Sequence, residues 1–172
     1  MTYRVEHGTR AQSRRLQAIE LAAGARFRAV GMGDVADGEP TPTPILEDRA
    51  DAGRLYVAVD EAGEPVGFLI WSPKDDRAYV EEVSVHPDHA GHRLAARMID
   101  RLSHDVRGRH AALSLATFRD VAWNAPYYAS IGFQELPRDQ IGPQHAKAWR
   151  HQTENGSDMS RRLFMTRPVA PQ

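Results

Sequence analysis

The stretch VSVHPDHAGHRLAARMI, residues 83–99, decides the fold because its character changes twice along its length. It begins as an apolar strand that stops at Pro87, and a turn through Gly91 follows. Residues 91–104 then predict a helix, because their apolar side chains fall on one stripe opposite arginines. The members of that stripe are Leu94, Ala95, Met98, Ile99 and Leu102. A strand, a small turn and an amphipathic helix in this order predict a mixed α/β protein.

The turn before this helix is suited to an anion. The first amide hydrogens of a helix have no intrahelical acceptor, and their dipoles make that end partly positive. Gly91 permits backbone conformations that other residues resist, and the small side chains of Ala90, Ala95 and Ala96 let a ligand approach the backbone closely. The turn has neither the ending of an ATP-binding P-loop nor the three-glycine dinucleotide fingerprint. The turn is therefore predicted to bind a phosphate group, but as neither of these two nucleotide-binding motifs.

The segments on either side predict one domain. We expect a first helix within residues 10–24, a Gly/Pro-rich acidic excursion over 31–54 with at most a short helix at 45–52, and a short helix ending at Gly132. Neither a repeat nor a convincing linker divides the chain, so residues 1–172 are expected to form a single domain. The expected strands are residues 3–7, 54–60, 65–73, 79–87, 111–118, a segment starting at Phe133, and 161–166.

Composition excludes several classes of function. The chain has 172 residues, a formal net charge of -1 and no cysteine. The charge gives no reason to expect binding to nucleic acid or to an anionic membrane, and the missing cysteines exclude disulfides, thiolate zinc sites and a cysteine nucleophile. Because no signal core or apolar run of about 20 residues is found, we expect a cytoplasmic protein without membrane contact.

Residues 85–95 resemble the pyrophosphate loop of the GNAT family of N-acetyltransferases. That loop follows a strand ending V-x-P and has the form Q/R-x-x-G-x-G/A at the start of a helix; here V85-H86-P87 and A90-G91-H92-R93-L94-A95 take these places. Two positions depart from the pattern, since Ala90 replaces a glutamine or arginine and Arg93 replaces a glycine.

A second segment resembles the same family. Asn124 to Phe133, NAPYYASIGF, is similar to the family's N-x-x-x-Y-x-x-x-G-F segment, whose tyrosine often acts as a general acid. Tyr128 matches that tyrosine, and Tyr127 is its neighbour. The resemblance covers roughly residues 55–135, the motif-bearing core of the expected N-acetyltransferase domain, and the two flanks match only in layout.

The resemblance implies a fold and an activity. The fold would be a single mixed, mostly antiparallel β-sheet flanked by helices, with one splayed pair of strands. The activity would be direct transfer of an acetyl group from acetyl-CoA to a small-molecule amine or an exposed protein amine, without a covalent enzyme intermediate. A non-catalytic acyl-CoA-binding module is the alternative. The oligomeric state is left open, with a homodimer as one choice.

The resemblance also implies catalytic residues. Tyr128 would be the general acid, with a packing tyrosine as the alternative interpretation. Glu82 or Glu81 would be the base, acting through a water. Strand alternation sends these two carboxylates to opposite faces, so at most one of them enters an acceptor site directly. We favour Glu82, against the alternative that both acids face solvent.

The expected cofactor contacts follow the two motifs. The strand residues Val83, Ser84 and Val85 would offer backbone groups to the pantetheine arm. Asn124 would hydrogen-bond the cofactor or cap a helix, and the sequence favours the two equally. No metal site is expected, and His86, His89 and His92 are interpreted as solvated loop residues. The loop contacts would come from Ala90, Gly91, His92, Arg93, Leu94, Ala95 and Ala96.

Overall fold

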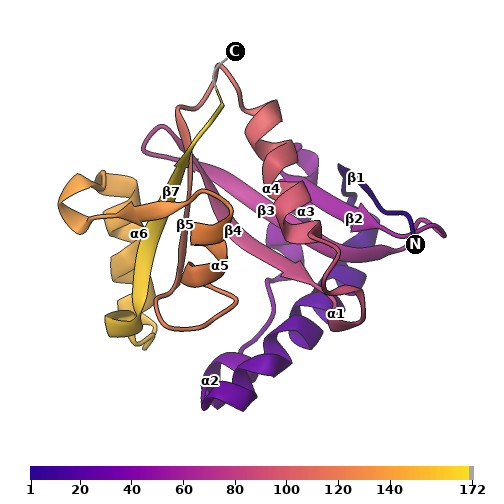
Figure 1. Cartoon of the computed structure of the whole chain (residues 1–172), viewed down its shortest axis with the longest axis horizontal. Helices are drawn as coiled ribbons and strands as arrows, with labels where there is room; N and C mark the ends of the chain where they lie inside the picture. Colours follow the sequence, from indigo (N-terminus) through magenta and orange to yellow (C-terminus); the bar gives the residue numbers. More distant parts are fainter. Residues whose placement is uncertain (171–172) are drawn as a thin grey trace. The chain divides into compact units, whose positions relative to one another are not determined.

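The computed structural model describes residues 1–170, whose strands form one sheet of seven in the order β1-β2-β3-β4-β5-β7-β6 (Figure 1). The sheet is mixed, because β4 and β5 are parallel while the other pairings for which the register is known are antiparallel. This agrees with the expected fold class. The strands are β1 (Arg4–His7), β2 (Leu55–Val59), β3 (Pro65–Lys74), β4 (Arg77–Val85), β5 (Ala112–Phe118), β6 (Gln134–Leu136) and β7 (Arg162–Pro168).

Four of the six α-helices that the structure describes agree with the sequence patterns, whereas the short helix Gly33–Ala36 lies in the excursion where only a helix at 45–52 was expected. The first four α-helices include the one predicted after Gly91, and short 3₁₀ turns occur beside several of them. The last, Pro143–Glu154, was not predicted. The helices are α1 (Ser13–Gly24), α2 (Gly33–Ala36), α3 (Thr43–Asp51), α4 (Leu94–Asp105), α5 (Ala125–Ser130) and α6 (Pro143–Glu154).

The chain packs as two compact units, which are described separately. Unit 1 consists of Met1–Trp71 and Glu82–Leu102. Unit 2 consists of Ser72–Glu81 and the chain from Ser103 onward. Strands β3 and β4 each pass from one unit into the other. In the part of the chain that the structure describes, no helix combines the length and the apolar character that crossing a bilayer requires.

Unit 1 is built on the antiparallel strands β1, β2 and the first part of β3. Alternate side chains of β2 and β3 pack against the apolar stripe of α1 and one residue of α3. This follows from the two-residue repeat of a strand and the 3.6-residue repeat of a helix. Each member of this core is at most 1% exposed. Its residues are Leu16, Ile19, Leu46, Leu55, Val57, Val59, Phe68 and Ile70.

Unit 2 is organised around β5. Arg77–Val80 of β4 pair with Ala112–Leu115 in parallel, β7 lies antiparallel along the whole of β5, and β6 pairs with β7 (Figure 1). The parallel ladder ends at Val80, and β4 continues to Val85. The core consists of Tyr79, Leu136, Trp149 and Phe164.

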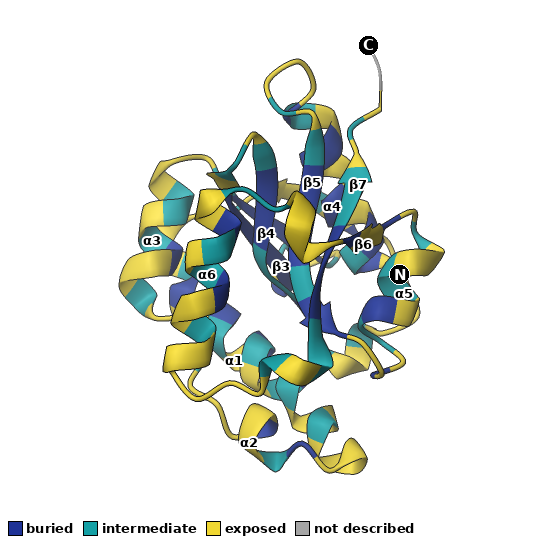
Figure 2. Ribbon diagram, turned by 90° about the vertical axis from the view of Figure 1, so that its left-hand side faces the viewer, coloured by how far each residue is buried: buried dark blue, intermediate teal, exposed yellow. Residues whose placement is uncertain are grey.

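Helix α6 enters the core of unit 2 through two side chains at i and i+4. His145 and Trp149 are its buried residues, and Figure 2 shows the rest of the helix mainly exposed or intermediate. With only two inward-facing side chains, one of them a histidine, α6 has little of the apolar stripe by which an amphipathic helix is recognised. That explains why periodicity did not predict it.

Candidate functional site

The sequence-predicted site residues are divided between the two units. Unit 1 holds Glu82, the strand residues 83–85 and the loop residues 90–96, whereas unit 2 holds Glu81, Asn124 and Tyr128. Each group is described within its own unit.

The turn before α4 has the conformation of a glycine-rich loop at two positions. Gly91 has φ +82° and Arg93 has φ +56°, so both lie in the left-handed region. No described atom lies within 4 Å of where a Cβ on Gly91 would stand, so the glycine is required by its backbone angle and faces open space. Arg93, which stands where the family pattern has a glycine, thus adopts a left-handed backbone conformation that glycine favours.

Helix α4 starts directly after this turn. The amide of Arg97 donates to the carbonyl of Arg93 at 2.9 Å, which closes the first helical turn. Gly91, His92 and Arg93 are exposed, while Leu94 and Ala96 are buried beneath them. The exposed turn thus joins a helix end whose first amides have no intrahelical acceptor, the arrangement that binds phosphate groups.

Two histidines of the loop contact the start of the chain, which the interpretation as solvated residues missed. The Tyr3 hydroxyl lies 2.9 Å from Nδ1 of His89, and the Tyr3 ring packs against His92 at 5.0 Å between centroids. The Tyr3 carbonyl accepts a hydrogen bond from the Arg97 guanidinium at 2.8 Å. Tyr3 is 6% exposed, so it fixes the loop from beneath.

The end of β4 carries Glu82 and Ser84 on one face. The Ser84 hydroxyl donates to Oε1 of Glu82 at 2.7 Å. A Cβ on Gly67 of β3 would lie 3.0 Å from the Ser84 carbonyl and 3.2 Å from a methyl of Val85. Glycine at position 67 therefore lets β3 approach the segment that was predicted to face the pantetheine arm.

Helix α5 ends in a motif that explains the Y-x-x-x-G-F spacing. The amide of Phe133 donates to the Tyr128 carbonyl at 3.0 Å, and the amide of Gly132 donates to the Ala129 carbonyl at 3.2 Å. With Gly132 at φ +97°, this is a Schellman termination. The Phe133 ring meets the Tyr128 ring edge-on at 5.7 Å. The motif thus fixes the position of Tyr128, whose side chain is only partly buried.

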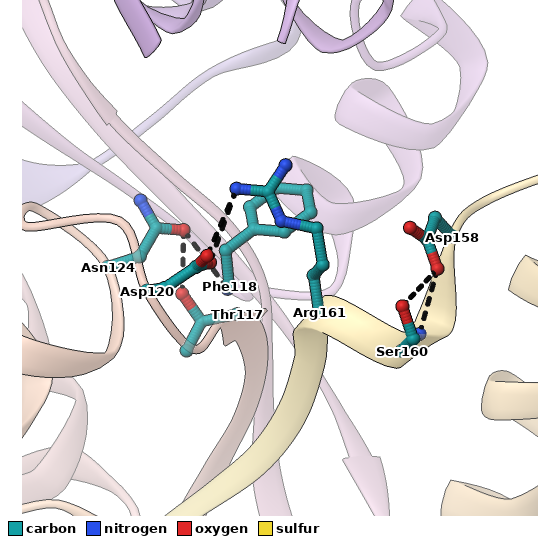
Figure 3. A network of polar contacts seen from close by, with 7 residues as sticks. All are labelled: Thr117, Phe118, Asp120, Asn124, Asp158, Ser160 and Arg161. Atoms are coloured by element: carbon teal, nitrogen blue, oxygen red, sulfur yellow. Dashed lines mark hydrogen bonds and ion pairs between the residues drawn. The ribbon is translucent and has the colours of Figure 1, made fainter. Parts of the chain in front are cut away.

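Asn124 connects β5 to α5 rather than capping the helix with its side chain. Its Oδ1 accepts hydrogen bonds from the Thr117 hydroxyl at 2.7 Å and the Phe118 amide at 3.3 Å (Figure 3). Asn124 does occupy the N-cap position, and its carbonyl accepts from Tyr128, but its side chain makes no capping hydrogen bond. Arg161 pairs with Asp120 in the same region.

Glu81 lines a cavity of about 510 Å³ in unit 2. One wall comes from β3 and β4 and the other from one face of α6. Only Glu81 among these residues was predicted from the sequence, because α6 gave no recognisable signal. The lining residues are Pro73, Lys74, Tyr79, Glu81, Gln144, Lys147, Ala148, His151 and Gln152.

A polar network, exposed at Gln144 and buried at His145, joins the β3–β4 turn to the start of α6. Asp75 and Asp76 form the turn with φ values of +47° and +65°, the hairpin conformation in which two residues are left-handed. Asp75 accepts hydrogen bonds from the amides of Gln144 at 3.0 Å and His145 at 2.8 Å, so it caps α6 from another part of the chain. The Gln144 side chain accepts from the Asp75 amide in return, at 2.6 Å.

The network continues through the His145 ring to β5. Nδ1 of His145 lies 2.6 Å from Asp75, and Nε2 lies 2.8 Å from the hydroxyl of Ser114. His145 and Ser114 are both 0% exposed, so no substrate reaches this Ser–His–Asp array and its role is structural. Gly142 leaves the necessary room, because a Cβ there would stand 2.6 and 2.8 Å from the Asp75 oxygens.

The charges of this network follow from burial and hydrogen bonding. Burial lowers the pKa of His145 below its usual value, although Asp75 acts to raise it. Burial acts to raise the pKa of Asp75, but the hydrogen bonds from His145 and Gln144 lower it further, so the net shift is downward. Asp75 is thus ionised and His145 neutral, with its proton on Nδ1, because a carboxylate only accepts.

No metal centre emerges from residues 1–170, where no three His, Cys, Asp or Glu side chains gather as metal ligands.

Solved structures with the same fold include several acetyltransferases. N-acetylglutamate synthase from Neisseria gonorrhoeae superimposes with a TM-score of 0.74 at 13% identity over 99% of this chain, which spans 36% of that protein. The ribosomal-protein-S18-alanine N-acetyltransferase of Escherichia coli gives 0.64 at 16% identity, over 99% of this chain and 96% of that one. PaiA N-acetyltransferase from Thermoplasma acidophilum gives 0.67 at 10% identity, over 98% and 99%.

The sequence itself matches the model of a family over most of its length. The match extends over residues 18–133 and includes both the loop before α4 and the segment from Asn124 to Phe133. With the fold and the left-handed loop described above, this match shows that the chain belongs to the acetyltransferase (GNAT) family.

Proposed function

We propose that this protein is an acetyl-CoA-dependent N-acetyltransferase whose single domain spans residues 1–172. The observation that carries the proposal is the turn at Gly91 and Arg93, which holds two left-handed residues before a long helix in a chain of the acetyltransferase family. Such a turn exposes backbone amides at a partly positive helix end, where the pyrophosphate of coenzyme A would bind.

Two of the structural neighbours bind coenzyme A, which supports acetyl-CoA as the donor. The Neisseria gonorrhoeae enzyme was crystallised with coenzyme A and N-acetyl-glutamate, and the Thermoplasma acidophilum enzyme with coenzyme A. In our proposal, the cofactor contacts come from Val83 to Val85, from the loop Ala90 to Ala96, and from Asn124. The amide nitrogen of Asn124 suits this role because its oxygen is already used by Thr117 and Phe118.

The proposed reaction is direct attack of an amine on the thioester. A base removes a proton from the amine, nitrogen bonds to the acetyl carbon, and the carbon–sulfur bond breaks while Tyr128 protonates the departing thiolate. Well-placed acid and base groups each accelerate such a step by about 10²- to 10⁴-fold. The Schellman motif supports Tyr128 in this role, because it fixes the backbone from which the hydroxyl projects.

The choice of base is between neighbouring carboxylates. Glu82 accepts a hydrogen bond from Ser84, whereas Glu81 lines the cavity against α6. The sequence favoured Glu82 as the base, but because Glu81 lines the cavity we propose that Glu81 faces the acceptor and acts through a water, with Glu82 as the second candidate. Their different surroundings follow from strand alternation, which sends adjacent residues to opposite faces.

Calorimetric titration with acetyl-CoA tests the loop. We expect micromolar binding by the wild-type protein and a loss of at least about tenfold in Gly91→Val, because valine does not tolerate the left-handed backbone. Gly63→Val is the matched control: Gly63 has φ +85°, equally open surroundings and a place in the β2–β3 turn. Equal losses in both variants, or no binding by the wild type, would contradict the proposal.

The tyrosine tests catalysis against the alternative of a non-catalytic acyl-CoA-binding module. Tyr128→Phe should lower thiol release by about 10²-fold while acetyl-CoA binding stays within about threefold, and Tyr127→Phe should leave both nearly unchanged. If the wild type binds acetyl-CoA but Tyr128→Phe alters no turnover with any amine, the binding module is the better description.

A further inference from the structure

We propose that the cavity between β4 and α6 in unit 2 binds the acceptor, and that the acceptor is a small amine that also carries an anionic group. This inference rests on the proposed function, because it names the substrate class for the same reaction. It concerns residues that the sequence patterns did not single out, above all Lys74 and Lys147.

The cavity has the size and the walls of a small-molecule site. Its volume of about 510 Å³ falls within the range of ligand pockets, about 300 to 1,000 Å³. Gln144, Lys147, Ala148 and His151 recur at i, i+3, i+4 and i+7 of α6, so one helix face forms one wall. The opposite wall is formed by the hairpin and by Tyr79 and Glu81 of β4.

The charges on the two walls are of both signs. Glu81 supplies a carboxylate from β4, whose negative charge would attract a protonated amine. Lys147 supplies an ammonium group from α6, and Lys74 supplies a second one, which lies 5.3 Å from the Tyr79 ring centroid. A simple amine would be attracted by one carboxylate and repelled by two lysines. An amine that carries a carboxylate or a phosphate can pair its ammonium group with Glu81 and its anionic group with the lysines.

Further hydrogen-bonding groups extend the site. The Tyr79 hydroxyl is hydrogen-bonded to Gln152, and burial raises the pKa of Tyr79, so its hydroxyl stays protonated. Gln144 and His151 add further polar groups on α6. Because these side chains can both donate and accept hydrogen bonds, the preference for an anion rests on Lys74 and Lys147.

The site is held in place before a ligand arrives. Asp75 fixes the first amides of α6 to the β3–β4 turn, and His145 ties the helix to Ser114 of β5. Because these bonds join the two walls, binding needs little additional ordering of the backbone. The backbone positions of the two lysines relative to Glu81 are therefore fixed, and only their side chains rotate.

The test measures acetylation of matched pairs of acceptors by the protein of residues 1–172. Amino acids, 4-aminobutyrate and 5-aminovalerate are each measured against the corresponding primary amide, and O-phosphoethanolamine is measured against ethanolamine. For the best acceptor we expect kcat/KM about tenfold higher for the anionic member, the size of one charge-assisted hydrogen bond. The carboxylate and phosphate pairs show which anion the site takes.

Lys147→Met should reduce this preference below about threefold, while Arg150→Met should retain it. Arg150 is the matched control, because it is an exposed cation of the same helix that does not line this cavity. Amides that serve as well as the acids would overturn the inference. A preference that survives Lys147→Met would overturn it too.

Amide chemical shifts separate this inference from the proposed function. Titration of the labelled protein with the anionic members, without acetyl-CoA, should shift the resonances of Lys147 and Gln152. If they shift but acetyl-CoA does not bind, the proposed function fails and the specificity of the cavity stands. If acetyl-CoA is bound and no anionic acceptor shifts them, the cavity is not the acceptor site.

Discussion

Replacing Asp75 by asparagine tests whether the polar network fixes α6. Asparagine has nearly the same shape and tolerates the left-handed turn angle of +47° as aspartate does. It can still accept from the Gln144 amide, but it places an NH₂ group opposite the amide of His145. The substitution therefore changes charge and hydrogen bonding while leaving the turn intact.

The magnitude follows from the three hydrogen bonds that the Asp75 side chain accepts. The ring can recover its bond by moving the proton to Nε2 and donating to Ser114, but the His145 amide is left facing a donor. A hydrogen bond to a charged group contributes about 1.5 to 3 kcal/mol, and a buried group without a partner costs about 1 to 3 kcal/mol. We expect the free energy of unfolding to fall by about 2 to 4 kcal/mol.

Urea unfolding at pH 7.5 measures this loss, followed by far-UV circular dichroism and by tryptophan fluorescence, to which Trp149 of α6 contributes. Asp76→Asn is the control, because Asp76 is the exposed second residue of the same turn, and it should change stability by less than about 0.5 kcal/mol. A loss below about 0.5 kcal/mol in Asp75→Asn would refute the reasoning.

Three further predictions follow from the same structure. Gly142→Ala brings a methyl group against the Asp75 carboxylate and should cost about 1 to 3 kcal/mol in urea unfolding, with a less than additive loss when combined with Asp75→Asn. Arg93→Gly relieves a left-handed arginine and should raise the free energy of unfolding by about 0.5 to 1 kcal/mol; a clear loss would show that the guanidinium stabilises the loop. Because the pKa of buried His145 is lowered, its unfolded form takes up a proton first, so stability should fall below about pH 6.5 by up to about 1.4 kcal/mol per pH unit. The depressed pKa of Asp75 gives a further loss only at lower pH, and urea titrations between pH 7.5 and 5.5 that show rising stability on acidification would contradict this assignment.

Local patterns predicted most of the fold. The helix expected after Gly91 is α4, and the strand expected at 161–166 is β7, Arg162–Pro168. Both have strong periodicity or flanking turns, so their local sequence suffices. Helix α6 was missed because its burial depends on one tryptophan and one histidine. A proline at its first turn after Gly142 was the signal that could have indicated it.

The site was less predictable because its contacts join distant segments. The bond between Asp75 and His145 spans 70 residues, and no local pattern relates a hairpin turn to a helix that has not been recognised. The left-handed conformation of Arg93 was also not predictable, because arginine rarely adopts a positive φ. The Schellman motif at Gly132, by contrast, is local, and the spacing from Tyr128 to Phe133 already contained it.

The pairing of β5 with β7 leaves one edge of β5 without its partner while the chain is being synthesised. The apolar strand Ala112–Phe118 is translated well before its partner Arg162–Pro168, and at about 5 to 20 residues per second the partner leaves the ribosome a few seconds later. During this interval one edge of β5 offers unpaired amides and carbonyls to any neighbouring strand. We therefore expect the pairing with Arg162–Pro168 to limit aggregation of the new chain, and truncated chains that end before Arg162 to depend on chaperones to remain soluble.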